Sequence, residues 1–118
     1  MISKLSMRVL IVGLDDWVPL AAVVGLARQL GAVGDAEAAE ASTASVRELT
    51  QHHLVELGNV SDGGFFVHEG PDDRILACIA NAIRTTDSRE WGFSCWMRNT
   101  PTGDELARTQ RLKNGSNH

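Results

Sequence analysis

The sequence predicts an α+β domain, because a chain of 118 residues contains both helical patterns and short strand-like patterns. Several segments carry apolar residues three and four positions apart, which is the period of a helix with one buried face. Shorter segments are rich in β-branched and aromatic residues and suit strands. The hydrophobic fraction of 43% and charged fraction of 22% are typical of a globular chain. We expect one domain over residues 1–118, with frayed ends at 1–6 and 114–118.

The first third of the chain is expected to hold a strand and then a helix. Met7–Val12 is a short β-branched run closed by a glycine, which favours a strand. Asp15 and Asp16 offer N-caps to a helix with Pro19 in its first turn, and Gly31 suits the end of that helix. The apolar face of this helix consists of Leu20, Val23, Val24, Ala27 and Leu30.

The centre of the chain predicts two consecutive helices. Asp35–Glu40 is expected to form a short acidic helix. Ser42 or Thr43 then caps a second helix that ends near His52. The residues of this second helix that are expected to face inward are Val46 and Leu49.

Two short strands are expected next. His53 is a residue type that tolerates the left-handed conformation, which suits the step from helix to strand. Leu54–Val60 is expected to be a strand broken by Gly58, and Phe65–Val67 a second strand after a turn at Ser61–Gly64.

The last third of the chain predicts a helix, a strand and a final helix. Pro71–Arg84 starts with a helix-compatible proline, and its apolar stripe is Ile75, Leu76, Ile79 and Ile83. Phe93–Arg98 reads as a strand with Phe93, Cys95 and Met97 on one face and Ser94, Trp96 and Arg98 on the other. Thr100 caps a last helix that has Pro101 at its first position and runs to about Leu112.

Two segments resemble a known family. Ser42–Leu57 (STASVRELTQHHLVEL) resembles the second helix and following strand of a winged helix-turn-helix, with His53 where that family usually has glycine. Cys95–Ala107 (CWMRNTPTGDELA) resembles the closing strand and helix start, commonly a Leu-Thr-x-x-Gly-x-x-Leu pattern. The chain is also similar to small uncharacterised bacterial proteins with an Asp-Trp helix start and an Asn-Thr-Pro-x-Gly end.

The resemblance covers residues 16–62 and 93–112 and implies a winged-helix-like domain. The chain departs from the family between the wing strands, because about thirty residues that contain the helix Pro71–Arg84 separate Val60 from Phe93. Either this helix is inserted between the wing strands, which is the fold we expect, or the sheet has an order of its own. We therefore expect Leu54–Val60 and Phe93–Arg98 to lie in the same sheet.

The charge of the helix-turn-helix-like segment argues against a role in binding DNA. Residues 35–62 carry one arginine, Arg47, and six carboxylates, a net charge of −5, in a chain whose net charge is −4. DNA affinity rests mainly on cations that neutralise phosphates. Because this segment would repel the duplex, we expect DNA binding to be weak or absent.

Catalytic, metal and cofactor sites have little support. Three histidines and two cysteines lack the C-x-x-C and H-x₃-H spacing of a zinc site; they are His52, His53, His68, Cys78 and Cys95. Both cysteines suit buried apolar positions. The two glycine-rich motifs that bind phosphate, G-x-G-x-x-G and G-x-x-x-x-G-K-[ST], do not occur in the sequence. No apolar run is long enough to span a membrane, no signal peptide is evident, and two cysteines suit the cytoplasm.

The sequence therefore favours a small non-enzymatic cytoplasmic protein-binding or regulatory module without a cofactor. Its partner would be another protein or a second copy of the chain. Two alternatives stay open: a winged-helix DNA-binding transcriptional regulator, and an acidic immunity or antitoxin-type protein that blocks a basic partner. The candidate interaction residues are Trp96 and Arg98, since Trp and Arg are enriched at binding hot spots, together with Arg47.

Overall fold

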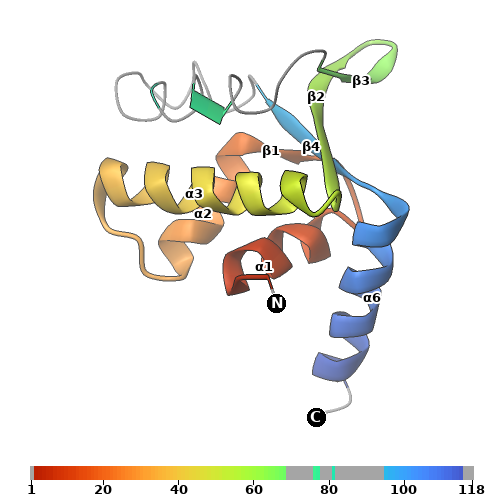
Figure 1. Cartoon of the computed structure of the whole chain (residues 1–118), viewed down its shortest axis with the longest axis horizontal. Helices are drawn as coiled ribbons and strands as arrows, with labels where there is room; N and C mark the ends of the chain where they lie inside the picture. The colour runs from red at the N-terminus through yellow and green to blue at the C-terminus, as the bar shows by residue number, and fades with distance from the viewer. Residues whose placement is uncertain (1, 69–75, 78–80, 82–94, 116–118) are drawn as a thin grey trace.

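The protein is a mixed α+β domain, as the sequence predicts (Figure 1). The computed structural model describes residues 2–68, 76–77, 81 and 95–115. Within these residues the elements are α1 (Lys4–Val12), β1 (Val18–Pro19), α2 (Leu20–Gln29), α3 (Gly34–Gln51), β2 (Val55–Ser61), β3 (Gly64–Val67), β4 (Trp96–Asn99) and α6 (Pro101–Gly115).

The four strands form one antiparallel sheet in the order β1-β4-β2-β3. The prediction that Leu54–Val60 and Phe93–Arg98 share a sheet is confirmed, because β2 pairs directly with β4. Met97 stands opposite both Leu57 and Val18, and all three side chains are buried. One face of the sheet therefore packs against the hydrophobic core.

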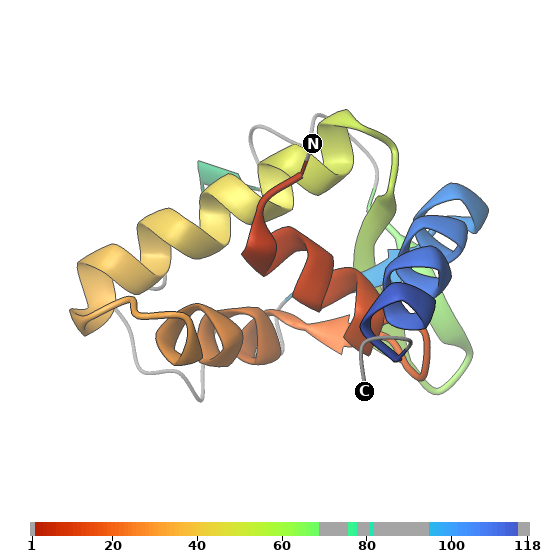
Figure 2. The same cartoon turned by 90° about the horizontal axis from the view of Figure 1, so that it is seen from below.

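Helices α1, α2 and α3 gather on one side of the sheet, and α6 returns beside α1 (Figures 1 and 2). The predicted inward positions Val46 and Leu49 are both buried on α3. The predicted face of α2 is buried at Leu20, Val23, Val24 and Ala27, whereas Leu30 at its end is 38% exposed. Gly31 then turns the chain with a φ of 114°, as expected of a residue that ends a helix.

The N-terminal element is a helix, so the prediction of a strand at Met7–Val12 is wrong. The Ser3 hydroxyl caps α1 by accepting a hydrogen bond from the Ser6 backbone N–H, and Val9 and Leu10 are fully buried. Burial of one helical face overrides the β-branched character of this segment. The expected fraying of residues 1–6 does not apply to 4–6, where Leu5 is also buried.

The start of α2 also differs from the prediction. Val18 and Pro19 form β1, and α2 begins one residue later, with Pro19 at the N-cap and no side-chain cap. Asp16 does not cap the helix; its carboxylate accepts a hydrogen bond from the Trp17 backbone N–H at 2.7 Å. A strand of two residues is too short to leave a periodic signal.

The two helices predicted around residue 41 are one helix, α3. Ser42 and Thr43 are buried in its middle rather than capping a second helix. The segment has no proline or glycine to interrupt it and is rich in alanine, the best helix former. Its end is as predicted, because His53 adopts the left-handed conformation with a φ of 55°.

Strand β2 passes through Gly58 without a break, contrary to the prediction, and Gly58 stands opposite both Val67 and Trp96. A Cβ atom there would lie 2.6 Å from Cε1 of Phe65, so glycine serves close packing at this position. The predicted turn before β3 is confirmed: Ser61 pairs with Gly64, whose φ is 114°.

The start of α6 follows the prediction closely. The Thr100 hydroxyl accepts a hydrogen bond from the Gly103 backbone N–H at 3.1 Å and donates one to the His53 carbonyl at 2.8 Å. Pro101 is the first residue of the helix. The Asn99 amide donates to the Leu10 carbonyl at 2.8 Å, which ties the strand before α6 to the last turn of α1.

Most of the predicted helix Pro71–Arg84 lies outside the described residues. Leu76 and Ala77 are helical, and Leu76 is buried in the same core cluster as Val46 and Leu49. This turn lies beside α3 in both views of the chain (Figures 1 and 2). Among the described helices, none has the length and apolar character needed to cross a membrane.

Candidate functional site

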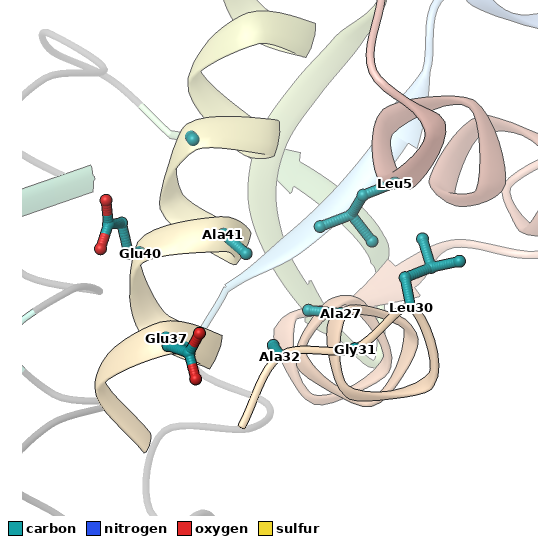
Figure 3. Close-up of a pocket in the computed structure, with 9 residues that line it drawn as sticks. Leu5, Ala27, Leu30, Gly31, Ala32, Glu37, Glu40 and Ala41 are labelled. Carbon is teal, nitrogen blue, oxygen red and sulfur yellow. The ribbon is translucent and has the colours of Figure 1, made fainter. Parts of the chain in front are cut away.

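A hollow of about 480 Å³ opens between α3 and α2, with the first turn of α1 at its edge (Figure 3). The α1 and α2 side of this hollow is formed by Leu5, Ala27, Leu30, Gly31 and Ala32, and the α3 side by Glu37, Glu40, Ala41 and Ala44. Its walls are mostly small side chains. Space therefore remains between two helices that are otherwise packed against each other.

A second hollow, of about 290 Å³, continues the first one along α3. The two share Leu5, Ala41 and Ala44, and the second adds Ser45 and Glu48 with Ser3. We call the two hollows together the α3 groove. From Glu37 to Glu48 it follows twelve residues of α3, which are separated by a rise of about 16 Å along the helix axis.

The α3 groove is acidic. Its walls contain Glu37, Glu40 and Glu48 and no lysine or arginine among the described residues. Glu37 accepts a hydrogen bond from the Val33 backbone N–H at 3.1 Å, and Glu48 accepts one from the Ser3 N–H at 2.9 Å. Both donors are uncharged backbone N–H groups, so neither bond brings a positive charge into the groove.

The Ser3 backbone N–H, followed by the Ser6 hydroxyl, lowers the pKa of Glu48 below its ordinary value, and desolvation opposes this only in part. Glu48 is therefore held in its ionised form. Ser3 and Ser6 also connect α1 to α3, because the Ser6 and Ser45 hydroxyls lie 2.8 Å apart in the buried interface. The same contacts that hold the two helices together thus fix one charge of the groove.

Apolar side chains stand at the end of the groove next to these charges. Leu30 is 38% exposed, and Val33, which follows the groove residue Ala32, is 74% exposed. Nearby, Arg28 and Asp35 form an ion pair at 2.9 Å. Since that arginine is paired with Asp35, no described lysine or arginine forms an ion pair with Glu37, Glu40 or Glu48. The groove thus offers small apolar walls and a negative edge.

Two of the sequence-predicted interaction residues, Trp96 and Arg98, lie together on the face of β4 opposite Met97. The Arg98 guanidinium bonds the Glu56 carboxylate at 3.0 Å and stands 4.7 Å from the centre of the Phe65 ring. The Phe65 ring in turn lies 5.6 Å from that of Trp17. Arg98 is therefore used within the protein, where it joins β2, β3 and β4.

Arg47, the third predicted residue, is exposed on α3 and does not line the groove. Its carbonyl accepts a hydrogen bond from the Thr50 hydroxyl at 3.0 Å, but within the described part of the chain its guanidinium makes no ion pair. The structure therefore does not bring Arg47 into one cluster with Trp96 and Arg98.

The groove residues were missed from the sequence. The signal that could have identified them is the spacing of one helical face, which is followed by Glu37, Ala41, Ala44 and Glu48. The predicted break near Ser42 placed the two ends of this face in different helices and concealed it.

The described residues contain no group of three or more His, Cys, Asp or Glu side chains placed to hold a metal ion. Cys95 is buried, as predicted, whereas Cys78 lies outside the described residues. His52 and His53 are exposed at the end of α3. Comparison with known proteins gave no matching family model, no significantly similar curated protein and no significantly similar solved structure.

Proposed function

We propose that this protein is a small non-enzymatic protein-binding module whose α3 groove takes a basic amphipathic helix from a partner protein. The observation that carries the proposal is the acidic, small-walled groove along α3. Amphipathic helices commonly bind by laying an apolar face into such a groove, with anchors at helical spacing.

The dimensions of the groove suit this kind of ligand. About 16 Å corresponds to roughly three turns of a partner helix, which present two or three apolar anchors on one face. Alanine side chains such as Ala41 and Ala44 leave room for leucine-sized anchors. Lysine or arginine flanking those anchors would meet Glu37, Glu40 and Glu48, and such complementarity favours correct partners and fast association.

The runner-up is a winged-helix DNA-binding regulator. The element order and the pairing of β4 between β1 and β2 support a winged-helix-like domain in which β3 and the following residues are an insertion into the wing. In such a domain α3 would be the helix that enters the major groove. Glu37 and Glu40 are exposed on α3 against one cation, Arg47, so phosphates would be repelled. An immunity or antitoxin-type role against a basic partner is one form of the protein-binding proposal.

The proposal is tested by titrating the protein with a synthetic lysine–leucine amphipathic helix in a calorimeter. Ala44→Phe fills the middle of the groove without changing charge, whereas Ala36→Phe places the same side chain on an exposed position of α3 outside the groove. We expect Ala44→Phe to weaken binding at least about tenfold, or 1.4 kcal/mol, and Ala36→Phe to bind as the parent does.

A second pair of variants separates shape from charge. Glu40→Gln removes a groove carboxylate, and Glu105→Gln removes an exposed one on α6. Glu40→Gln should weaken the binding of the basic helix, whereas Glu105→Gln should change its affinity little. Equal binding by Ala44→Phe and Ala36→Phe, or tight binding of a random duplex at physiological salt, would overturn the proposal.

A further inference from the structure

The two edges of the sheet differ in how well they are protected from pairing with another strand. β1 consists only of Val18 and Pro19, and a proline has no N–H to donate to a neighbouring strand. β3, at the other edge, has four residues, Gly64–Val67, and contains neither proline nor a charged residue (Figure 1). Short length, proline and charge are the usual features that keep an edge strand from pairing. The β3 edge is therefore the less protected of the two.

The outward side of β3 carries backbone groups that do not bond β2. The His68 N–H donates to the Leu57 carbonyl at 2.8 Å, and Phe66, two residues earlier, has the same orientation toward β2. The N–H and C=O groups of Phe65 and Val67 then point away from β2, because the orientation alternates along the strand. Within the described part of the chain, these outward groups make no backbone hydrogen bond.

The side chains of the same strand leave apolar surface uncovered. Phe66 is 53% exposed and Val67 is 48% exposed. Among the strand residues that the structure describes, these two are the only large apolar side chains that are exposed. Outward backbone groups beside exposed apolar side chains are the features of an edge to which a further strand is added.

We propose that the β3 edge pairs with the β3 edge of a second copy of the chain, antiparallel and around a two-fold axis at Phe66. In this register Phe65 of each copy lies opposite Val67 of the other, and each such pair exchanges both of its N–H···O bonds. The two Phe66 side chains face each other in the intervening pair, the type in which opposite residues are closest. The sheet then continues through both copies, and the assembly closes as a dimer because its remaining edges are the β1 strands.

The charges at the two ends of β3 favour a second copy over an unrelated strand. Asp62 precedes the strand and His68 follows it, and no charged residue lies between them. In the antiparallel register, His68 of one copy lies opposite Gly64 of the other, which has no side chain, and diagonal to Asp62. The imidazole of each copy can therefore reach the carboxylate of the other, and like charges do not meet anywhere along the paired strands.

The experiment measures the oligomeric state by sedimentation velocity, from micromolar to millimolar protein. Phe66→Lys places like charges opposite each other at the axis, and Val67→Pro removes an outward N–H but no bond to β2. Leu112→Lys is the matched control, because Leu112 is 75% exposed on α6 and receives the same change away from the sheet. Thermal melts followed by circular dichroism check that every variant is folded.

We expect the parent to form dimers, Phe66→Lys and Val67→Pro to weaken dimerisation at least about tenfold, and Leu112→Lys to dimerise as the parent does. A mixture of Phe66→Lys with Phe66→Glu should form dimers more readily than either variant alone, because opposite charges then meet at the axis. A parent that stays monomeric at millimolar concentration, assemblies larger than a dimer, or a dimer unaffected by Phe66→Lys would overturn the proposal.

Amide hydrogen exchange tests the register without any substitution. Exchange at Phe65 and Val67 should slow as the protein concentration rises, because their N–H groups bond only in the dimer, whereas Phe66, which faces β2, should change less. Exchange that is independent of concentration at Phe65 and Val67 would contradict the pairing. The inference does not rest on the proposed function, since no residue of β3 lines the α3 groove, so either proposal can fail without the other.

Discussion

Gly103 is the position where a single methyl group tests the placement of α6. Gly103 is buried in the first turn of this helix, against the segment that leads into β2. An added Cβ would press on the Leu54 carbonyl oxygen and lie 3.1 Å from the carbon of that carbonyl and 3.3 Å from Cδ2 of Leu10. The obstructing atoms belong to the backbone, and the same carbonyl accepts a hydrogen bond from the Thr100 N–H at 3.0 Å. If Gly103 and the Leu54 carbonyl moved apart, this hydrogen bond would be lost.

We therefore predict that Gly103→Ala lowers the free energy of unfolding by about 1–3 kcal/mol, the usual cost of overpacking. The better helix propensity of alanine, at most about 1 kcal/mol, offsets part of the clash and is smaller in a first turn. At about 4 °C per kcal/mol, the melting temperature should fall by about 4–12 °C.

Gly25 provides the matched control. It is exposed in the middle of α2, and an added Cβ there meets nothing within 4 Å. Gly25→Ala should therefore raise stability by up to about 1 kcal/mol, because alanine is the better helix former. Both variants are measured by thermal and urea unfolding followed by circular dichroism. A Gly103→Ala variant as stable as Gly25→Ala would refute the close approach of α6 to Leu54.

Three further predictions concern the helical core. Leu49→Ala should destabilise by about 2–5 kcal/mol in urea unfolding, because this side chain is fully buried; a loss under 1 kcal/mol would contradict its placement. The buried Thr43 hydroxyl has no hydrogen-bond partner among the described residues, so Thr43→Val should be neutral or stabilising in the same assay. Ser45→Ala leaves the Ser6 hydroxyl with one hydrogen-bond partner fewer and should cost about 1 kcal/mol. The pKa of Glu48 is lowered in the folded protein, so its contribution to stability is present above the unfolded value of 4.5 and is lost as pH falls through the folded pKa. The free energies of unfolding of Glu48→Gln and the parent should therefore converge at low pH. A difference that stays constant with pH would reject this linkage.

Local signals predicted the elements that depend on local chemistry. The apolar face of α2, the left-handed His53 and the Thr100–Pro101 start of α6 follow from residue types whose preferences act over a few positions. The strand predicted at Met7–Val12 failed because β-branched residues also pack well on a buried helical face, and tertiary contacts decide between the two.

The candidate site depended on longer-range information. The carboxylates of α3 were evident in the sequence, but only as a charge that disfavours DNA. A helix that continues through Ser42 places Glu37 and Glu48 along one groove, and the sequence prediction of a cap at Ser42 or Thr43 divided that face. The opposing wall comes from Leu5 and Leu30, which are distant in sequence, so no local pattern could show it.

The central claim is that α3 presents a groove for a basic helix rather than a surface for DNA. Its most direct test is amide chemical-shift mapping by NMR, with the lysine–leucine helix and a random duplex added to separate samples at physiological salt. The claim predicts that the helix shifts the amides of Leu30–Ala32, Ala41 and Ala44, and that the duplex shifts almost none. Shifts by the duplex around Arg47, or shifts by the helix confined to the sheet face at Arg98, would contradict it.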